Sequence, residues 1–269
     1  MAPRRSTATR PDPVLVGAVT ALRAAGSVFA EDEAAMLLAE ARSASHLAEM
    51  IERRTSGAPL EQVLGWAELR GVRVAVVPGV FVPRRRSELL VDEAVALLGA
   101  RSLPVVVDLC CGTGAVGAAV AAVRDVELYA ADVDPVAVAC ARHTVRPADR
   151  VFLGDLFDAL PDALRGRVDV LVANAPYVPT GEIRLLPAEA RDHEPHRALD
   201  GGADGLDMHR RVAQGAREWL APGGRLLVET SERQAPGTVS IVRQAGLVPR
   251  VVRREEADAT VVVGSLPGS

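Results

Sequence analysis

The sequence contains no lysine, so all 31 of its basic residues are arginines. They are outnumbered by 35 acidic residues, and the formal net charge is −4. A net acidic chain argues against a nucleic-acid-binding protein, which needs positive charge along the phosphate backbone. A GC-rich coding sequence explains the preference for arginine more simply than a binding function does.

Aromatic residues, cysteines and long apolar runs are also scarce. Aromatics make up only 3% of the chain, so the core must consist mainly of Ala, Val and Leu. The three cysteines, Cys110, Cys111 and Cys140, have neither the spacing of a disulfide framework nor that of a zinc site. No run is long enough to span a membrane, and the first 13 residues lack the apolar stretch of a signal peptide. We therefore expect a cytoplasmic protein with reduced thiols.

The chain has 269 residues, which suffice for one large and one small domain. The spacing of its apolar residues changes near residue 66. Apolar residues recur at helical spacing before that point, which predicts a helical domain over residues 1–66, with residues 1–13 disordered. Alternating valines around Pro78-Gly79 predict a β-hairpin linker over residues 67–83. The third predicted domain comprises residues 84–269.

Strand and helix patterns alternate in this third domain. The predicted strands are residues 105–109, 127–131, 150–153, 168–173 and 225–229, and the predicted helices are residues 115–123, 135–145 and 205–220. Residues 260–263 predict a further strand that closes the edge of the sheet. This alternation is typical of an α/β fold, with a doubly wound parallel sheet covered by helices on both faces.

The predicted strand at 168–173 is followed directly by Asn174-Ala175-Pro176-Tyr177. Open α/β sheets bind their ligands at the carboxyl ends of such strands. The Asn174 side chain and the Ala175 backbone each offer a carbonyl acceptor, and Tyr177 offers a flat ring. This set suits a planar –NH2 group, although Asn and Pro are also common where a strand passes into a loop.

A glycine-containing loop follows the first strand of this domain, in the sequence Asp108-Leu109-Cys110-Cys111-Gly112-Thr113-Gly114. Its glycines allow the backbone to approach a ligand at the start of a helix. Asp132 ends the second strand, where a carboxylate can accept both hydroxyls of a ribose. Asp155, followed by Leu156, ends the third strand and is a candidate for binding an adenine amine. All these strand ends are expected to line one crevice.

Two cofactors are compatible with this loop. Gly112, Gly114 and Gly117 have the spacing of a dinucleotide fingerprint, which would indicate an NAD-dependent oxidoreductase. Asp108 at the start of the loop would repel a pyrophosphate, however, and would attract the ammonium group of a methionine moiety. Asp155 and the Asn174 motif have no role in hydride transfer. The residues therefore favour S-adenosyl-L-methionine over NAD.

Together these motifs resemble the class I methyltransferases, and more narrowly the protein-(glutamine-N(5)) methyltransferases, which include the HemK/PrmC-related enzymes. That family carries Asn-Pro-Pro-Tyr where this chain has residues 174–177. Residues 57–65 resemble its Gly-x-Pro-Leu segment, and residues 82–88 resemble its Ile-Pro-Arg-Pro-Glu-Thr-Glu. Residues 194–199 and 201–206 are similar to its Glu-Pro-x-x-Ala-Leu and Gly-Gly-x-Asp-Gly-Leu segments. The resemblance covers roughly residues 31–264.

The resemblance implies a Rossmann-like domain with a mostly parallel seven-stranded sheet and a helical docking domain. It implies methyl transfer from S-adenosyl-L-methionine to a glutamine side chain of a peptide release factor or a related translation protein. The implied catalytic residues are Asn174, Ala175, Pro176 and Tyr177, and the implied substrate-side residue is Glu194. The implied cofactor-binding residues are Asp108, Cys110, Gly112, Gly114, Asp132, Asp155, Leu156 and Asn174. Ala175 and Cys110 depart from the family, which has proline and glycine there, and the helical domain is shortened after residue 41.

An exocyclic adenine amine of RNA or DNA is a planar, delocalised nitrogen like an amide, so an adenine methyltransferase is the alternative function. It would need a basic groove. The one basic run, residues 84–86, is interpreted as a solvated loop beside the crevice. The predicted helices over residues 14–64 carry four Arg and seven acids and indicate protein docking. We thus expect nucleic acid to be involved only indirectly.

Two expectations concern metal and assembly. Pro195 interrupts the segment from His193 to His196, so no regular helix aligns the two imidazoles, and we expect no metal. We also expect a monomer without membrane contact, although nothing in the sequence reports the oligomeric state.

Overall fold

The computed structural model describes residues 12–268, which form two compact units divided between Leu64 and Gly65. The prediction of disorder for residues 1–13 falls outside the described part of the chain, except for residues 12 and 13. Pro13 begins the first helix, and the Asp12 carboxylate caps that helix by accepting the Val14 N–H at 2.9 Å.

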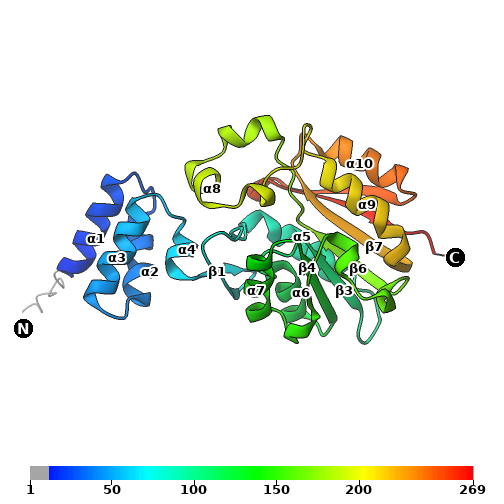
Figure 1. Cartoon of the computed structure of the whole chain (residues 1–269), viewed down its shortest axis with the longest axis horizontal. Coiled ribbons are helices and arrows are strands. Elements are labelled where there is room, and N and C mark those ends of the chain that lie inside the picture. Colours follow the sequence, from blue (N-terminus) through cyan, green and yellow to red (C-terminus); the bar gives the residue numbers. More distant parts are fainter. Residues whose placement is uncertain (1–11, 269) are drawn as a thin grey trace, which may run out of the picture. The chain divides into compact units, whose positions relative to one another are not determined.

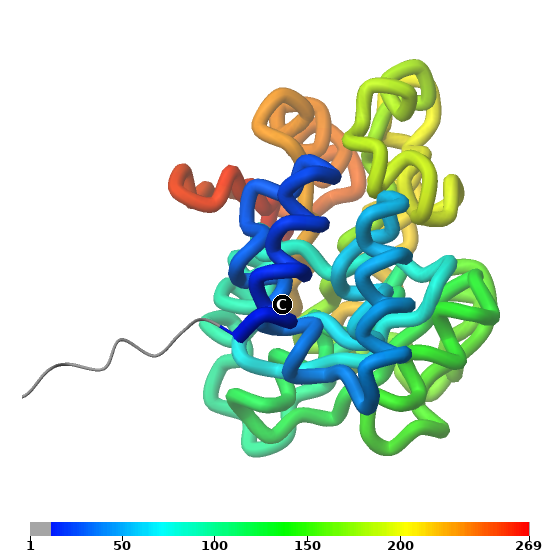
Figure 2. Tube along the Cα trace, turned by 90° about the vertical axis from the view of Figure 1, so that its left-hand side faces the viewer, coloured from blue at the N-terminus to red at the C-terminus, as the bar shows by residue number. Residues whose placement is uncertain are grey.

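The first unit consists of helices (Figures 1 and 2). They are α1 (Pro13–Ala24), α2 (Ala30–Glu40), α3 (Ala44–Thr55) and the short α4 (Leu60–Leu64). Small and branched residues fill its core, among them Ala18, Leu22, Ala34, Leu37 and Met50. Within this unit the Arg54 guanidinium makes a bidentate, largely buried pair with Glu33, at 2.8 and 3.0 Å, which ties α3 to α2.

The second unit opens with a β-hairpin, but its position differs from the prediction. Strands β1 (Trp66–Leu69) and β2 (Val72–Ala75) pair antiparallel. The turn lies at Arg70-Gly71, both with positive φ, and not at Pro78-Gly79. Two consecutive residues with positive φ form the primed turn that matches strand twist, whereas Pro78 lacks the N–H that a strand ladder needs.

A seven-stranded sheet forms the body of the second unit, as the resemblance implied. Its strands are β3 (Val105–Leu109), β4 (Glu127–Asp132), β5 (Val151–Leu153), β6 (Val168–Ala173), β7 (Leu220–Thr230), β8 (Val248–Arg254) and β9 (Ala259–Ser265). Their order is β5-β4-β3-β6-β7-β9-β8. The first five in that order are parallel, and β9 pairs antiparallel with both of its neighbours.

Helices cover both faces of this sheet, as predicted (Figure 1). Alternate residues of β3 enter different cores: Val106 packs with the helices on one face, and Val107 packs with those on the other. The first face carries α5 (Glu88–Ala96), α6 (Ala115–Val123) and α7 (Pro135–Thr144), and the second carries α9 (Asp207–Trp219) and α10 (Ala235–Gln244). Burial on both sides explains why the strands are apolar without alternation.

The edge-strand prediction for residues 260–263 is wrong. These residues belong to β9, which lies inside the sheet between β7 and β8, and Val261, Val262 and Val263 are at most 1% exposed. The edge is β8, a strand that the sequence pattern did not indicate. Arg250 and Arg253 on this strand are exposed, and such charged side chains oppose pairing of an edge with another chain.

No helix among residues 12–268 is both long enough and apolar enough to cross a membrane.

Candidate active site

A cavity of about 520 Å³ lies at the carboxyl ends of β3, β4, β5 and β6, within the second unit. This volume is in the range of small-molecule sites. The cavity brings together most of the predicted site residues: Asp108, Cys110, Gly112, Asp132, Asp155, Leu156, Asn174, Ala175, Pro176 and Tyr177. Gly114 and Glu194 do not line it.

The loop after β3 has the left-handed backbone that its glycines allow. Gly112 and Gly114 have φ of 54° and 74°. A Cβ on Gly114 would lie 2.8 Å from the Val145 side chain, so this glycine is needed for close packing behind the cavity rather than for ligand contact. Cys110 has φ of 55° although it carries a side chain, which places a strained residue at the site.

Asp108 is a carboxylate 2% exposed at the start of this loop. Its Oδ2 accepts the Gly117 N–H at 2.8 Å. A Cβ on Gly117 would lie 3.1 Å from the same oxygen, so the glycine lets α6 approach the carboxylate. Burial, with a smaller effect from the charge of Asp132, raises the pKa of Asp108 to about 7, against the lowering effect of the hydrogen bond from Gly117.

Asp132 and Asp155 end the next two strands. The Asp132 Oδ2 accepts the Gly112 N–H at 2.8 Å and its Oδ1 accepts the Asp134 N–H at 2.9 Å, which fixes the carboxylate at the cavity wall. Each oxygen keeps a lone pair for a ligand hydroxyl. Asp155 is exposed, and its Oδ2 accepts from Arg211 of α9 at 2.7 Å. Arg211 therefore also belongs to the cavity wall.

Asn174 is half-buried directly after β6. Its Nδ2 donates to the hydroxyl of Ser87 at 3.1 Å, and Ser87 is 1% exposed. The side-chain oxygen of Asn174 has no partner among the described residues. Ala175 is 1% exposed and lines the cavity.

A second buried carboxylate, Glu229, lies behind Asn174 and Tyr177. It lies one residue before the end of β7, and its Oε1 accepts a hydrogen bond from the Tyr177 hydroxyl at 3.4 Å. The Arg86 Nε is 3.6 Å from its Oε1. Burial raises the pKa of Glu229, against the lowering effects of Ser87, Arg86 and Tyr177. Burial, with the charge of Glu229, also raises the pKa of Tyr177, so the phenol stays neutral.

The interpretation of the basic run as a solvated loop is wrong for two of its three residues. Arg84 and Arg86 line the cavity, and each pairs with a buried carboxylate, Arg84 with Glu194 and Arg86 with Glu229. Buried carboxylates need a cation or donors close by, so the two arginines are drawn inward. Glu194 itself lies behind the wall, where it also accepts the Val82 N–H at 3.3 Å.

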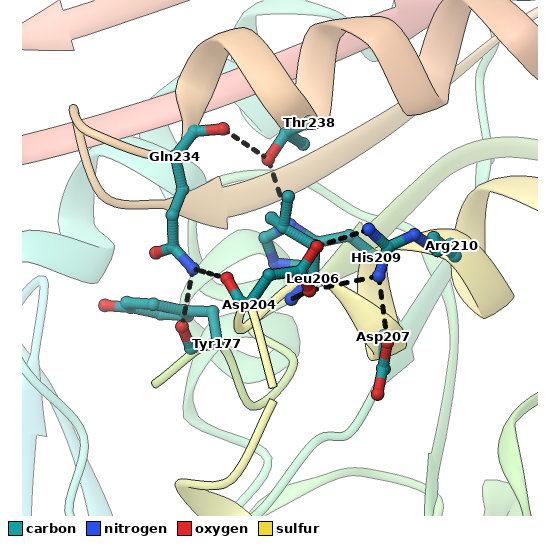
Figure 3. A network of polar contacts seen from close by, with 8 residues as sticks. All are labelled: Tyr177, Asp204, Leu206, Asp207, His209, Arg210, Gln234 and Thr238. Carbon is teal, nitrogen blue, oxygen red and sulfur yellow. Dashed lines mark hydrogen bonds and ion pairs between the residues drawn. The ribbon is translucent and has the colours of Figure 1, made fainter. Parts of the chain in front are cut away.

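The segment 201–206 supports the Asn174 motif from behind (Figure 3). The Gln234 side chain donates to the carbonyls of Tyr177 at 2.9 Å and of Asp204 at 3.2 Å, and so joins the two segments to α10. Gly205, with φ of 75°, touches the same place: a Cβ there would lie 2.4 Å from the Tyr177 carbonyl oxygen. The glycines of this segment thus allow backbone to pack on backbone.

Two further side chains in Figure 3 hold this support in place. The fully buried His209 contacts the Thr238 hydroxyl at 3.0 Å through Nδ1, and its ring lies 6.3 Å from that of Tyr177. Burial lowers the pKa of His209 to about 4, so the ring is neutral near neutral pH. Arg210 pairs with Asp204 and with Asp207, which fixes the segment to the start of α9.

The chain is similar in sequence to known proteins. The model of the Methyltransferase small domain matches residues 71–190. The release factor glutamine methyltransferase of Geobacter sulfurreducens is 35% identical over 223 residues, which cover 81% of this chain and 77% of that protein. The chain belongs to the release factor glutamine methyltransferase family.

Two further comparisons bear on substrate and fold. The 4-amino-L-phenylalanine/4-methylamino-L-phenylalanine methyltransferase of Streptomyces pristinaespiralis is 36% identical over 203 residues, 73% of this chain and 71% of that protein. A methyltransferase of Pyrococcus furiosus superposes with a TM-score of 0.56 at 14% identity, over 74% of this chain and 90% of that one, and shares the fold. Membership of the release factor glutamine methyltransferase family confirms the predicted class I fold, the methyltransferase activity and S-adenosyl-L-methionine as cofactor.

The loop of this release factor glutamine methyltransferase family member fits that cofactor and not a dinucleotide. The N–H groups of Gly112 and Gly117, which a pyrophosphate would need, donate instead to Asp132 and Asp108. The carboxylates of Asp108, Asp132 and Asp155 suit a ligand with an ammonium group and ribose hydroxyls. No ligand contact tests the predicted cofactor-binding residues, which therefore stay a prediction: Asp108, Cys110, Gly112, Gly114, Asp132, Asp155, Leu156 and Asn174.

We expect Asp108→Asn to make the ligand-free protein more stable at neutral and alkaline pH and to weaken cofactor binding about tenfold or more. The folded pKa of Asp108 lies above its unfolded value, so the wild type loses stability as pH rises from about 4 to about 7, by at most about 4 kcal/mol. The variant lacks this loss. Urea unfolding at about pH 5 and about pH 8, with calorimetry of cofactor binding, measures both effects. An equal stability difference at both pH values would contradict the assignment.

Sequence reasoning missed Ser87, Glu229, Arg211 and Gln234. Ser87 and Glu229 lie 142 positions apart in the chain. The pairing of β6 with β7 brings Glu229 to Asn174, and the turn before α5 brings Ser87 there. A buried acid directly at the end of a strand was the one available signal for Glu229. No local pattern distinguishes Arg211 or Gln234 from other polar residues near helix ends.

Proposed function

We propose that this protein transfers a methyl group from S-adenosyl-L-methionine to the side-chain amide nitrogen of a glutamine in a peptide chain release factor or a related translation protein. The observation that carries the proposal is the hydrogen bonding of the Asn174 amide. Its nitrogen donates to Ser87, so its oxygen is left to accept a hydrogen bond from a substrate beside the cofactor loop. Family membership supports the same substrate.

The residues supply positioning, which an amide nitrogen needs because its lone pair is delocalised into the carbonyl. The cofactor, when bound, supplies a methyl group activated on a sulfonium. The Asn174 oxygen and the Ala175 carbonyl would accept the two N–H groups of the glutamine, which holds the nitrogen in one orientation. Tyr177, neutral and fixed through Glu229 and Gln234, would pack against the amide plane. Together they reduce the orientational freedom that the reaction would otherwise have to overcome.

The helical unit is proposed as the region that docks the protein substrate. Its acids outnumber its arginines by seven to four over residues 14–64, which suits a partner with basic surface. The free thiols of Cys110, Cys111 and Cys140 support a reducing compartment, and we place the enzyme in the cytoplasm.

Incubation with radiolabelled cofactor tests this function. Purified release factors, 4-amino-L-phenylalanine and adenine-containing RNA are offered separately, and mass spectrometry locates the methyl group. We expect label on one glutamine side chain of a release factor, and none on a release factor in which that glutamine is replaced. Transfer to RNA alone, or to the free aromatic amine alone, would overturn the proposal.

A further inference from the structure

One wall of the cavity is a single excursion of the chain, residues 179–199, which we call the wall segment and which contains the short helix α8 (Ala188–His193) (Figure 1). Both of its ends meet at Val178, directly after the Asn174 motif. The Val178 N–H donates to the Leu199 carbonyl at 2.9 Å, and the Val178 carbonyl accepts the Gly201 N–H at 2.8 Å. The segment lines the cavity both before and after α8. Whatever holds this segment in place therefore shapes the cavity beside Asn174.

The wall segment lies outside the hydrophobic cores on the two faces of the sheet. Its buried apolar side chains are Ile183, Ala190 and Leu199, and none of them belongs to either core in the described part of the chain. Its charged side chains are at least partly exposed, except that of Glu194, of which 0% is exposed. A carboxylate leaves water only where donors compensate it, so the partners of Glu194 mark a point at which the segment is tied to the rest of the unit.

Glu194 is tied to two residues near the start of the second unit. Its Oε1 accepts the Val82 N–H at 3.3 Å and a hydrogen bond from the Arg84 guanidinium. Val82 is fully buried and packs in the core that contains Val106. The guanidinium carbon of Arg84 lies 5.2 Å from the centre of the Phe81 ring, a cation–π contact that limits where the arginine can lie. The wall segment is thus joined to a core through a residue 112 positions earlier in the chain.

We propose that Glu194 is a positioning residue, which holds the wall segment against Val82 and Arg84 and so fixes the acceptor side of the cavity. The inference rests on the proposed function for the identity of the acceptor. Glu194 does not line the cavity, so it acts on the acceptor through the wall segment and not by contact. The turn that follows Arg84 carries Ser87, which accepts from Asn174 at 3.1 Å, so the pair joins two sides of the same site.

Hydrogen exchange of the full-length, ligand-free protein, read by mass spectrometry, tests whether Glu194 holds the segment. We expect Glu194→Gln to speed amide exchange in residues 182–199 about 10- to 100-fold and to leave exchange in β3 and β6 unchanged. The amide keeps the size of the side chain but loses the charge that pairs with Arg84. Arg84→Gln removes the same pair from the other partner and should give the same acceleration. Unchanged exchange of residues 182–199 in either variant, or acceleration that extends over β3 and β6, would overturn the proposal.

Glu182→Gln is the matched control, because it makes the same substitution within the wall segment. Glu182 pairs with Arg233 at 2.6 Å, and the two side chains are 41% and 66% exposed. An exposed pair contributes little to stability, so exchange should stay within about twofold of the wild type. Equal acceleration in Glu182→Gln and Glu194→Gln would mean that burial of Glu194 is not what matters, and would contradict its role.

Kinetics show whether the Glu194–Arg84 pair acts on the acceptor. We expect Glu194→Gln to lower kcat/KM for the release factor about 10- to 100-fold. The Kd of S-adenosyl-L-methionine should change less than about twofold, because Asp108 and Asp132 are fixed by N–H groups of their own loops. A normal kcat/KM for the release factor, or an equal loss of cofactor affinity, would overturn the proposal.

The double variant distinguishes action through Arg84 from an independent role of Glu194. Arg84→Gln combined with Glu194→Gln should be no slower than the slower single variant, since both residues act through one pair. Losses that multiply would show that Glu194 acts without Arg84 and would sink the inference. Faster exchange in Glu194→Gln, together with no transfer by the wild type to any release factor, would instead contradict only the proposed function.

Discussion

Replacement of Asn174 by alanine should lower kcat for methyl transfer about 10²- to 10³-fold and leave the affinity for S-adenosyl-L-methionine almost unchanged. The substitution removes one of the two acceptors that would hold the glutamine nitrogen, an interaction comparable to a lost oxyanion-hole donor. The cofactor would be held mainly by residues of β3, β4 and β5, which do not depend on this side chain. Single-turnover kinetics and calorimetry measure the two effects separately.

Asn174→Asp is a second variant at this position, which keeps the size of the side chain and its acceptor oxygens. It loses the donor to Ser87, however, and brings a second carboxylate close to Glu229, so it should also be slow. A parallel loss of cofactor affinity in Asn174→Ala would show that Asn174 mainly holds the cofactor, and would contradict its assignment as a catalytic residue.

Replacement of Gly205 by alanine should destabilise the protein by about 2–4 kcal/mol and lower methyl transfer about 100-fold or more. The new Cβ would lie 2.3 Å from the Gln234 amide nitrogen and 2.4 Å from the Tyr177 carbonyl oxygen. One of these groups must move, and the backbone of the Asn174 motif moves with it. Urea unfolding and steady-state kinetics measure the two effects.

The matched control is Gly223→Ala. Gly223 has φ of 78°, close to the 75° of Gly205, but a Cβ there has no atom within 4 Å. This variant carries the same backbone strain without the contact, so we expect about 1–2 kcal/mol of destabilisation and normal transfer. Equal loss of transfer in both variants would mean that the contact with Tyr177 is not what matters.

Much of the fold could be predicted, because the strands of this sheet are buried on both faces. The predicted bounds of residues 105–109 and 168–173 agree with β3 and β6, which are mainly apolar and each contain a single aspartate. The strand β8 escaped prediction because an exposed edge strand carries arginines and proline. The placement of β9 inside the sheet depends on tertiary packing, since a run of valines does not specify which strands lie beside it.

The candidate site could be predicted for residues at the carboxyl end of a strand or in the loop that follows it. Asp108, Asp132 and Asn174 can be recognised in the sequence because each follows an apolar run. Ser87 has no such pattern, because its place beside Asn174 depends on how the segment before α5 crosses the sheet. The basic run was misjudged for the same reason: the buried carboxylates that attract Arg84 and Arg86 are about 110 and 143 residues away in the chain.

The position of β9 between β7 and β8 has a consequence for how this protein is made. During translation β7 and β8 both leave the ribosome before β9, the strand that joins them. Until then β8 has no partner in the sheet, and the outer edge of β7 exposes its backbone groups to other nascent chains. The outer edge of β7 is therefore open to pairing with another chain in the interval between the synthesis of β7 and that of β9.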